Sequence, residues 1–311
     1  MRRRLRLTGI AGTGTVRDRL LRRNPQLMRR PRRWLAASAA VLVLAGSGIA
    51  VRGVDLGVEF TGGRLIEYST ATPVDPDRAR AALADAGFPR VVVQSSDEEQ
   101  LTLRTGRLTD PEEARVTDTV RNLGGTADKV GDHMVGPSLG KELRQAALSA
   151  LVLALGAQLL YLAARFRWVF GTAAVTALAH DVIVLVGVFA WLGKPIDGVF
   201  VAALLTVIGY SGNNSVVVFD RIRERWRSGA GASFAQLTNR AILQTLPRTL
   251  NTGLGAAFIR TALAVLGGEA LGDFALALLV GLVIGTYSSV FTAAPVALEL
   301  QAHISSTPRR K

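Results

Sequence analysis

The sequence predicts a polytopic α-helical membrane protein with six transmembrane helices and one small α+β domain between the first and second spans. The 311-residue chain has a mean hydropathy of +0.29 and contains six long apolar runs, which a soluble domain of this size would not need. A helix requires about 20 apolar residues to cross a bilayer. The long loop after the first run has instead the mixed polarity of strands and surface helices.

The six apolar runs are interrupted by short charged loops, and the fifth contains Arg260. They are Trp34–Val51, Gln145–Ala164, Trp168–Trp191, Val199–Phe219, Thr249–Leu266 and Phe274–Leu298. These runs divide the chain into five parts. We expect a cytoplasmic Arg-rich tail at 1–33, a first transmembrane helix at 34–51, an extracytoplasmic α+β domain at 52–143, a five-helix transmembrane domain at 144–300 and a cytoplasmic tail at 301–311.

Charge is sorted along the chain in a way that predicts its orientation. Residues 1–33 hold twelve arginines and one acid, whereas residues 52–143 hold 16 acids and 11 basic residues. Arginine-rich loops stay on the cytoplasmic side of a membrane, so both termini are expected in the cytoplasm. Because the basic excess follows this sorting, we interpret it as a topology signal and as contact with anionic lipid, not as nucleic-acid binding. The absence of cysteine excludes disulfides and thiolate metal sites, and no cofactor is expected.

The loop at 52–143 is expected to fold as a domain of its own. Residues Gly57–Tyr68 resemble a strand bent at Gly62-Gly63, and Pro76–Ala86 resembles a helix. The remaining expected elements are a hairpin at Arg90–Gln94 and Gln100–Arg104, a helix at Pro111–Leu123 with Asp110 as its N-cap, and a strand at Ala127–Val135. The order β-α-β-β-α-β predicts a small ferredoxin-like sandwich. It carries no catalytic constellation, so we expect it to bind unfolded chains and not to act as an enzyme.

Polar side chains inside the apolar runs are the candidate functional residues, because such groups are costly in hydrocarbon and mark helix interfaces or ion paths. They are His180 and Asp181 in the third run, Asn213 and Asn214 in the fourth, and Arg248 and Arg260 at the start and middle of the fifth. Asp181 and Arg260 come at similar distances into their helices, which predicts a compensating ion pair. The alternative is that Arg260 extends to the membrane surface while Asp181 accepts hydrogen bonds elsewhere. His180 is interpreted as an interface residue more than as a proton relay.

Five motifs follow one another in a defined order. They are Gly57-Val-Glu-Phe60-Thr61-Gly62-Gly63, Val135-Gly136-Pro137-Ser-Leu-Gly140, Ala179-His180-Asp181-Val182, the fourth-run segment that ends in Phe219-Asp220-Arg221-Ile-Arg-Glu224, and Thr245-Leu-Pro-Arg248-Thr-Leu250. In this order and topology they resemble the SecF family of bacterial protein-export membrane proteins, of the resistance-nodulation-division superfamily. The resemblance covers residues 34–298.

The resemblance implies an auxiliary subunit of the Sec pathway in the bacterial cytoplasmic membrane. It would act with SecD as obligate partner, at the SecYEG channel and on the translocating polypeptide, using the proton-motive force. YajC and YidC are further implied candidates. Such proteins carry an aspartate where this chain has Asn214, and an amide has no protonation step near neutral pH. Two alternatives therefore stay open: a structural subunit that stabilises SecD without its own proton step, and half of a lipid or drug exporter of the same superfamily.

Overall fold

The computed structural model describes residues 19–89, 91–97, 99–228, 232–266 and 269–306. The first part of the expected Arg-rich tail, the end of the C-terminal tail and Arg90 of the expected hairpin lie outside these residues. The chain divides into two units. The sheet unit comprises Asp55–Leu151 and Pro195–Gly198, and the helical unit comprises Met1–Val54, Val152–Lys194 and Val199–Lys311. Each unit is described by itself.

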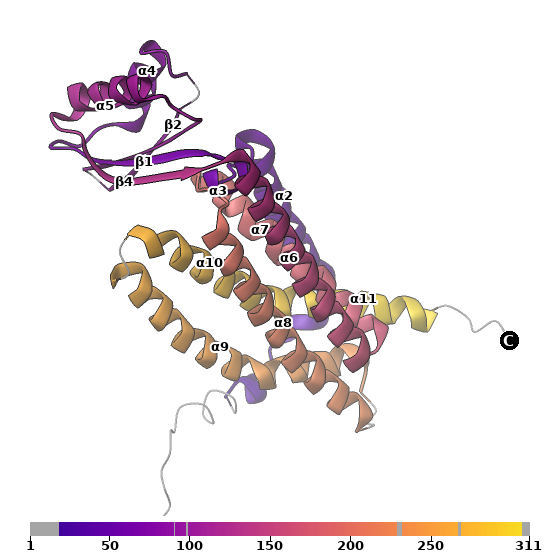
Figure 1. Cartoon of the computed structure of the whole chain (residues 1–311). Helices are drawn as coiled ribbons and strands as arrows, with labels where there is room; N and C mark the ends of the chain where they lie inside the picture. The colour runs from indigo at the N-terminus through magenta and orange to yellow at the C-terminus, as the bar shows by residue number, and fades with distance from the viewer. Residues whose placement is uncertain (1–18, 90, 98, 229–231, 267–268, 307–311) are drawn as a thin grey trace, which may run out of the picture. The chain divides into compact units, whose positions relative to one another are not determined.

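The sheet unit contains a four-stranded antiparallel sheet with the strand order β2-β3-β1-β4. Its strands are β1 (Gly63–Ser69), β2 (Val92–Asp97), β3 (Gln100–Thr105) and β4 (Asp128–Val135). Helix α4 (Pro76–Asp85) follows β1, and α5 (Asp110–Gly124) follows β3 (Figure 1). The predicted element order β-α-β-β-α-β is therefore present.

The core of this unit lies between the sheet and its two helices. Ile66 and Tyr68 of β1 are fully buried, because alternate side chains of a strand point to one face. They share an apolar cluster with Leu103 of β3, Leu83 of α4 and Val120 of α5, each also fully buried. The apolar faces of the two helices, which repeat every 3.6 residues, and of the strands, which repeat every 2 residues, thus pack into one core.

Two local predictions in this unit were wrong. Residues Val58–Thr61 form a short helix, α3, so the expected strand begins only at Gly63. The reason is the backbone at Gly62 and Gly63, whose φ values of 73° and 141° are favourable for glycine and turn the chain between α3 and β1. The N-cap of α5 is Thr109 and not Asp110, because Thr109 and Glu112 form a reciprocal capping box.

An ionic cluster links β1, β4 and α5. Arg64 donates to both carboxylate oxygens of Asp132, at 2.7 and 2.6 Å, and to Glu113 at 2.6 Å. Lys129 donates to Asp132 at 3.1 Å and also to Glu113. The hydrogen bonds from Arg64 lower the pKa of Asp132 from 3.8 to about 2, and those from Lys129 and Arg64 lower the pKa of Glu113. Ion pairs outside the apolar core therefore join β1, β4 and α5.

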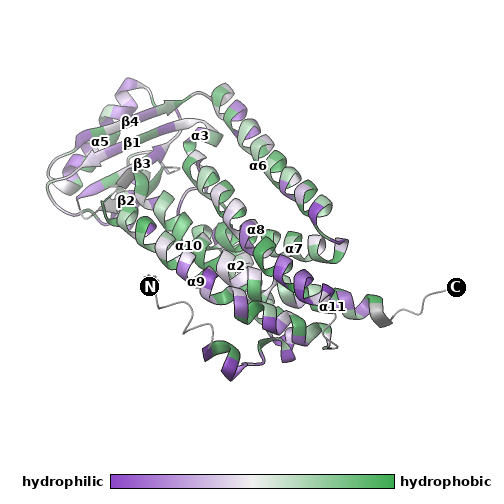
Figure 2. Cartoon of the chain, turned by 90° about the horizontal axis from the view of Figure 1, so that it is seen from below, coloured by the Kyte–Doolittle hydropathy of each residue, from purple (hydrophilic) through white to green (hydrophobic). Residues whose placement is uncertain are grey.

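Long apolar helices build the helical unit, with parts of two of them belonging to the sheet unit. They are α2 (Pro31–Arg52), α6 (Pro137–Arg165), α7 (Trp168–Leu192), α8 (Gly198–Arg227), α9 (Phe234–Leu266), α10 (Glu269–Phe291) and α11 (Ala293–Ser306). Within the described residues, six stretches are long and apolar enough to cross a membrane, with α10 and α11 together forming the sixth. In the most apolar stretch of α7, 61% of the residues are buried, against 6% in that of α6. Helix α7 is thus one of the inner helices of the unit, together with α8 and α10. Figure 2 shows hydrophobic residues, in green, along the long helices.

The sixth predicted span, Phe274–Leu298, is not one regular helix. Helix α10 ends at Phe291, Thr292 adopts a turn, and α11 begins at Ala293. Pro295 explains the interruption, because it has no N–H to donate to the carbonyl group of Phe291 and its ring disfavours a straight helix there.

Small residues let the inner helices approach each other closely. A Cβ atom at Gly281 of α10 would overlap the side chain of Val207 on α8. One turn later, a Cβ atom at Gly285 would lie 3.0 Å from Cβ of Ser211. Helix α7 approaches α2 in the same way, at Gly187 and Ala45. Close approach of this kind allows short polar side chains to bridge neighbouring helices.

Candidate functional site

A buried carboxylate lies where α7, α8 and α10 meet. Asp181 of α7 is 1% exposed. Its Oδ2 accepts hydrogen bonds from the hydroxyl of Ser288 on α10, at 2.7 Å, and from the hydroxyl of Ser211 on α8. Nδ1 of the preceding His180 lies 3.1 Å from its Oδ1. The four residues form what we call the Asp181 cluster.

Local sequence explains how each helix supplies its part of this cluster. Ser211 can reach α7 because Gly285 leaves α10 without a side chain at that level. Ser288 lies three residues after Gly285, on the same face of α10. A hydrogen bond to a charged group contributes about 1.5–3 kcal/mol, and leaving a buried carboxylate without such bonds costs at least as much. The two hydroxyls therefore hold α8 and α10 against Asp181.

The cluster contains groups that can bind and release a proton. Asp181 and His180 are both buried, and within the described residues Nε2 of His180 makes no hydrogen bond. The ring of His180 lies 6.2 Å from that of Tyr287, measured between centroids. Tyr287 continues the polar contacts towards α2, because its hydroxyl lies 3.2 Å from Ser38 Oγ, which is 2.8 Å from Thr292 Oγ1. Polar groups thus recur between the carboxylate and α2, but among the described residues a ring contact, not a hydrogen bond, joins His180 to Tyr287.

Asn214 belongs to the same face of α8 as Ser211, three residues further along the helix. It is 7% exposed, and its amide nitrogen is buried without a hydrogen-bond partner among the described residues. An amide can donate and accept hydrogen bonds but has no accessible protonation step. Of the two side chains, Asp181 on α7 and Asn214 on α8, only Asp181 carries an ionisable group.

The structure does not bring the other polar residues of the spans into the cluster. Asn213 and Arg248 are exposed side chains. Arg260 of α9 lies with its Cζ 5.4 Å from the centre of the Tyr210 ring, a cation–π contact. No ion pair joins Arg260 and Asp181, both of which the structure describes. The expected pair is absent because a similar depth does not fix the rotation of two helices about their axes.

The motif residues of the loops have mostly structural contacts. In the sheet unit, the Gly57 N–H donates to the carbonyl group of Ile196 at 3.0 Å, and Phe60 is 6% exposed. The Thr61 hydroxyl donates to the carbonyl group of Gly57. Gly136 directly precedes Pro137, the first residue of α6.

The charged motif after the fourth span ties helices of the helical unit together. Asp220 of α8 pairs with Arg165 of α6 at 2.9 Å. Arg221 donates to Gln244 of α9 at 2.7 Å and pairs with Glu224.

Sequence reasoning did not identify Ser211 and Ser288, the two serines that donate hydrogen bonds to Asp181. A serine in an apolar helix is common, and its hydroxyl often bonds the preceding turn of its own helix. The available signal was spacing: Ser211 is three residues before Asn214, so both occupy one helix face. For Ser288 no comparable signal exists, because its orientation depends on how α10 packs.

Comparison with known proteins agrees with this architecture. The family model described as "Protein export membrane protein SecD/SecF, C-terminal" matches residues 115–303, and the one described as "SecD/SecF GG Motif" matches residues 47–74. The protein translocase subunit SecF of Thermobaculum terrenum is 41% identical over 262 residues, covering 78% of this chain and 83% of that protein. SecF of Vibrio alginolyticus is 38% identical over 284 residues, covering 86% and 88%.

A solved structure supports the same relationship. The crystal structure of SecDF from Thermus thermophilus, a translocon-associated membrane protein, superposes with a TM-score of 0.80 at 35% identity. The match covers 88% of this chain but only 38% of the SecDF chain. A family model covering more than half of the chain, together with these relatives, shows that this chain belongs to the SecD/SecF family of protein export membrane proteins, on its SecF branch.

Proposed function

We propose that this chain acts with a SecD partner as an auxiliary subunit of Sec-dependent protein export and couples export to the proton-motive force. Its SecF relatives are named as translocase subunits. The SecDF protein of Thermus thermophilus, 36% identical over 270 residues, supports SecD as partner, because this chain accounts for only 36% of its length. The SecYEG channel and the translocating polypeptide are the further partners that this role requires.

The proton step within this chain is assigned to Asp181. The observation that carries this assignment is a carboxylate, 1% exposed, that accepts hydrogen bonds from serines on two other helices. A protonated carboxyl group donates one hydrogen bond where the carboxylate only accepted. Both serines donate to Oδ2, so a proton on Oδ2 requires at least one of Ser211 and Ser288 to turn, which changes the contacts that hold α8 and α10 against α7. A proton on Oδ1 leaves these two bonds in place and is offered to Nδ1 of His180. His180 serves as the neighbouring proton donor and acceptor.

The sheet unit is proposed to lie outside the cytoplasm, with both termini inside, as the arginine distribution indicates. Its element order and strand order support a ferredoxin-like assignment. In this arrangement its sheet edges are available to a chain emerging from the channel, and strand addition is a common way to bind an extended peptide.

The test is export of a reporter protein into vesicles at several imposed proton gradients, with SecD recovery measured in parallel. Asp181→Asn keeps the shape of the side chain and is expected to abolish this chain's share of the gradient response while SecD still co-purifies. Asn214→Asp is expected to add a pH-dependent component, because it restores a carboxylate one turn from Ser211. Asn213→Asp is its matched control, since the neighbouring amide is exposed and outside the cluster.

The opposite result would favour a second role. If Asp181→Asn responded to the gradient as the parent does, the proton step would lie entirely in SecD, and this chain would be a structural subunit. Asn214 favours that alternative, because an amide stands where the resemblance to the SecF family implies an ionisable aspartate.

A further inference from the structure

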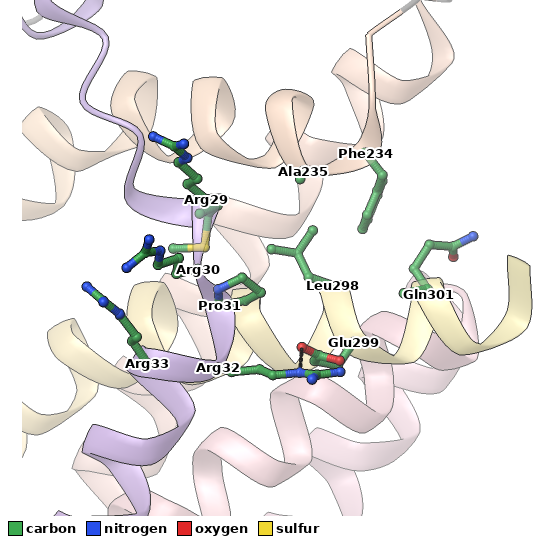
Figure 3. Close-up of a pocket in the computed structure, with 12 residues that line it drawn as sticks. Arg29, Arg30, Pro31, Arg32, Arg33, Phe234, Ala235, Leu298, Glu299 and Gln301 are labelled. Atoms are coloured by element: carbon green, nitrogen blue, oxygen red, sulfur yellow. Dashed lines mark hydrogen bonds and ion pairs between the residues drawn. The ribbon is translucent and has the colours of Figure 1, made fainter. Parts of the chain in front are cut away.

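The helical unit contains a cavity of about 660 Å³ beside the start of α2. Phe234 and Leu298 form its apolar wall. Figure 3 shows the side chains of Arg29, Arg30 and Arg33 projecting away from this wall. Because the charged groups and the apolar wall face different directions, they do not form one binding site in the described part of the chain. In the sheet unit, by contrast, a polar contact connects the sheet to the start of helix α8.

The segment between α2 and β1 lies against the short connection between α7 and α8. The carbonyl group of Asp55 accepts a hydrogen bond from the Ile196 N–H at 2.7 Å, and the Gly57 N–H donates to the Ile196 carbonyl group at 3.0 Å. Leu56 and Ile196 form a parallel β-bridge. All of these residues belong to the sheet unit, and so does Gly198, the first residue of α8. The sheet unit therefore includes the start of a helix whose other residues belong to the helical unit.

A carboxylate of this segment binds the first turn of α8. Oε2 of Glu59, in α3, accepts a hydrogen bond from the Gly198 N–H at 2.7 Å. The first N–H groups of a helix have no acceptor within the helix, and its positive end favours a negative charge. Glu59 lies 139 residues before Gly198 in the sequence, so this hydrogen bond joins α8 to a distant part of the chain.

Two glycines allow the close approach. A Cβ atom at Gly198 would lie 2.6 Å from Oε2 of Glu59, so a side chain there would displace the carboxylate. A Cβ atom at Gly57 would lie 2.8 Å from Cβ of Asp197. The motif Gly57–Gly63 therefore does more than turn the chain into β1: its first residues fit against the start of α8.

The segment that carries Glu59 is also fixed to the sheet. The carboxylate of Asp55 pairs with Arg104 of β3 at 2.5 Å, and the Arg104 side chain is 10% exposed. Phe60 of α3 is buried, and α3 continues through Gly62 directly into β1. A shift of Glu59 therefore reaches β1 through the covalent chain and β3 through an ion pair.

Helix α8 connects this contact to the Asp181 cluster. It extends from Gly198 to Arg227 and contains no proline. Ser211, whose hydroxyl donates to Asp181, comes 13 residues after Gly198. This distance is about 20 Å of helix at 1.5 Å per residue. One continuous helix thus has the sheet unit at its first residue and the buried carboxylate at Ser211.

We propose that Glu59 is a positioning residue that couples the Asp181 cluster to the sheet unit, by holding the first turn of α8 against α3. The inference rests on the proposed function, because it concerns the proton step assigned to Asp181. A proton on Oδ2 of Asp181 that turns Ser211 releases α8 from α7, and the hydrogen bond to Glu59 passes the resulting shift of α8 to α3 and β1. Without Glu59, the start of α8 moves independently of the sheet.

The experiment measures hydrogen–deuterium exchange of the purified full chain by mass spectrometry, in residues 196–201 and 58–66. Ser211→Ala removes the bond from α8 to Asp181 and should raise the exchange rate of both segments, by about fivefold in residues 196–201. Glu59→Ala should raise the exchange rate of residues 196–201 by about tenfold, because a charged hydrogen bond at a helix end is lost. In the Glu59→Ala background, Ser211→Ala should no longer change residues 58–66. A cap with only a structural role would leave that response intact.

Three further variants test the geometry. Glu59→Gln keeps an oxygen that can accept from the Gly198 N–H and should retain most of the protection and the response to Ser211→Ala. Gly198→Ala should resemble Glu59→Ala, because the added Cβ displaces the carboxylate, although alanine by itself is the better helix former. Glu99→Ala removes an exposed carboxylate of the same unit and should change neither segment.

The proposal is overturned by any of three results: unchanged exchange in Glu59→Ala, slower exchange in Gly198→Ala, or residues 58–66 that ignore Ser211→Ala in the parent or respond equally with and without Glu59. These measurements do not involve export. The proposed function fails if Asp181→Asn exports as the parent does, whereas this inference fails on exchange rates alone, so the two failures are distinguishable.

Discussion

Replacing Arg64 by methionine should destabilise the sheet unit by about 2 kcal/mol at pH 7 and remove much of its acid sensitivity. Arg64 holds two carboxylates on different elements, and its side chain is 12% exposed. For Asp132, the pKa falls from 3.8 to about 2, and each pKa unit corresponds to about 1.36 kcal/mol. The upper limit is therefore about 2.4 kcal/mol for this one group. Because the Asp132 side chain is 29% exposed, solvent screening reduces that share to about 1 kcal/mol.

The lost hydrogen bond from Arg64 to Glu113 supplies the remainder, since a hydrogen bond to a charged, partly exposed group contributes about 1 kcal/mol. The pKa of Glu113 is lowered mainly by Lys129 and also by Arg64. The sign follows from linkage: a carboxyl group whose pKa is lower in the folded state stabilises that state above its unfolded pKa. This stabilisation is complete above about pH 4 and is lost as the pH falls through about 2. The parent should thus lose stability over this window, and Arg64→Met should lose less.

The assay is urea unfolding of the purified full chain in detergent, followed by circular dichroism, because urea unfolds the sheet unit before the apolar helices. With a slope of about 1 kcal/mol per molar urea for a unit of this size, the midpoint should fall by about 1–2 M. Arg121→Met is the matched control: its pair with Asp118 is more than half exposed on both sides and should contribute less than about 0.5 kcal/mol. Equal midpoints for the two variants, or a parent midpoint that stays constant from pH 4 to pH 2, would refute the reasoning.

Three other outcomes are expected. Single cysteines at Ser95 and Ser228, both exposed, should react oppositely with an impermeant reagent added to intact cells, Ser95 reacting and Ser228 not; labelling of both would reject the proposed topology. A double-mutant cycle of Arg260→Leu and Asp181→Asn, measured as recovery of the complex with SecD, should be additive within about 0.5 kcal/mol, because the two residues share no contact. Gly281→Leu should destabilise the helical unit by about 1–3 kcal/mol in thermal unfolding, because α10 has no room for a side chain against α8.

Two of these predictions can be contradicted directly. A coupling energy above 1 kcal/mol between Arg260 and Asp181 would mean that the two residues do form the ion pair that their spacing suggests and that the structure lacks. For Gly281 the control is Gly272→Leu, since a Cβ atom at Gly272 meets nothing within 4 Å. If both glycine variants unfolded at the same temperature, close packing of α8 and α10 would not be the cause.

The secondary structure could be predicted from the sequence wherever a segment's own residues determine it. Length and hydropathy alone located the spans, because a helix in lipid must satisfy its backbone internally. The errors occurred where one residue decides between two local structures. Gly62 ends a helical turn where a strand was expected, Thr109 caps α5 one residue earlier, and Pro295 interrupts the last span.

The candidate site was predictable only in part, for a different physical reason. A carboxylate in an apolar run is conspicuous, so Asp181 could be named from the sequence. Its partners depend on the rotation and spacing of three helices, which small residues such as Gly285 set through packing. The expected partner Arg260 was chosen by depth, and depth leaves the direction of a side chain around its helix undetermined.

The contacts between α2 and the last helices also impose an order on biogenesis. Ser38 bonds Thr292, 254 residues later, and Arg32 pairs with Glu299, 267 residues later. A ribosome adds about 5–20 residues per second, so α2 exists for roughly 13–50 seconds before these partners are made. During that interval α2 can pack on α7, through Ala45 and Gly187, while the Ser38 hydroxyl lacks its final partner. A nascent chain stalled before Thr292 should therefore expose Ser38 to any factor that shields unfinished membrane helices.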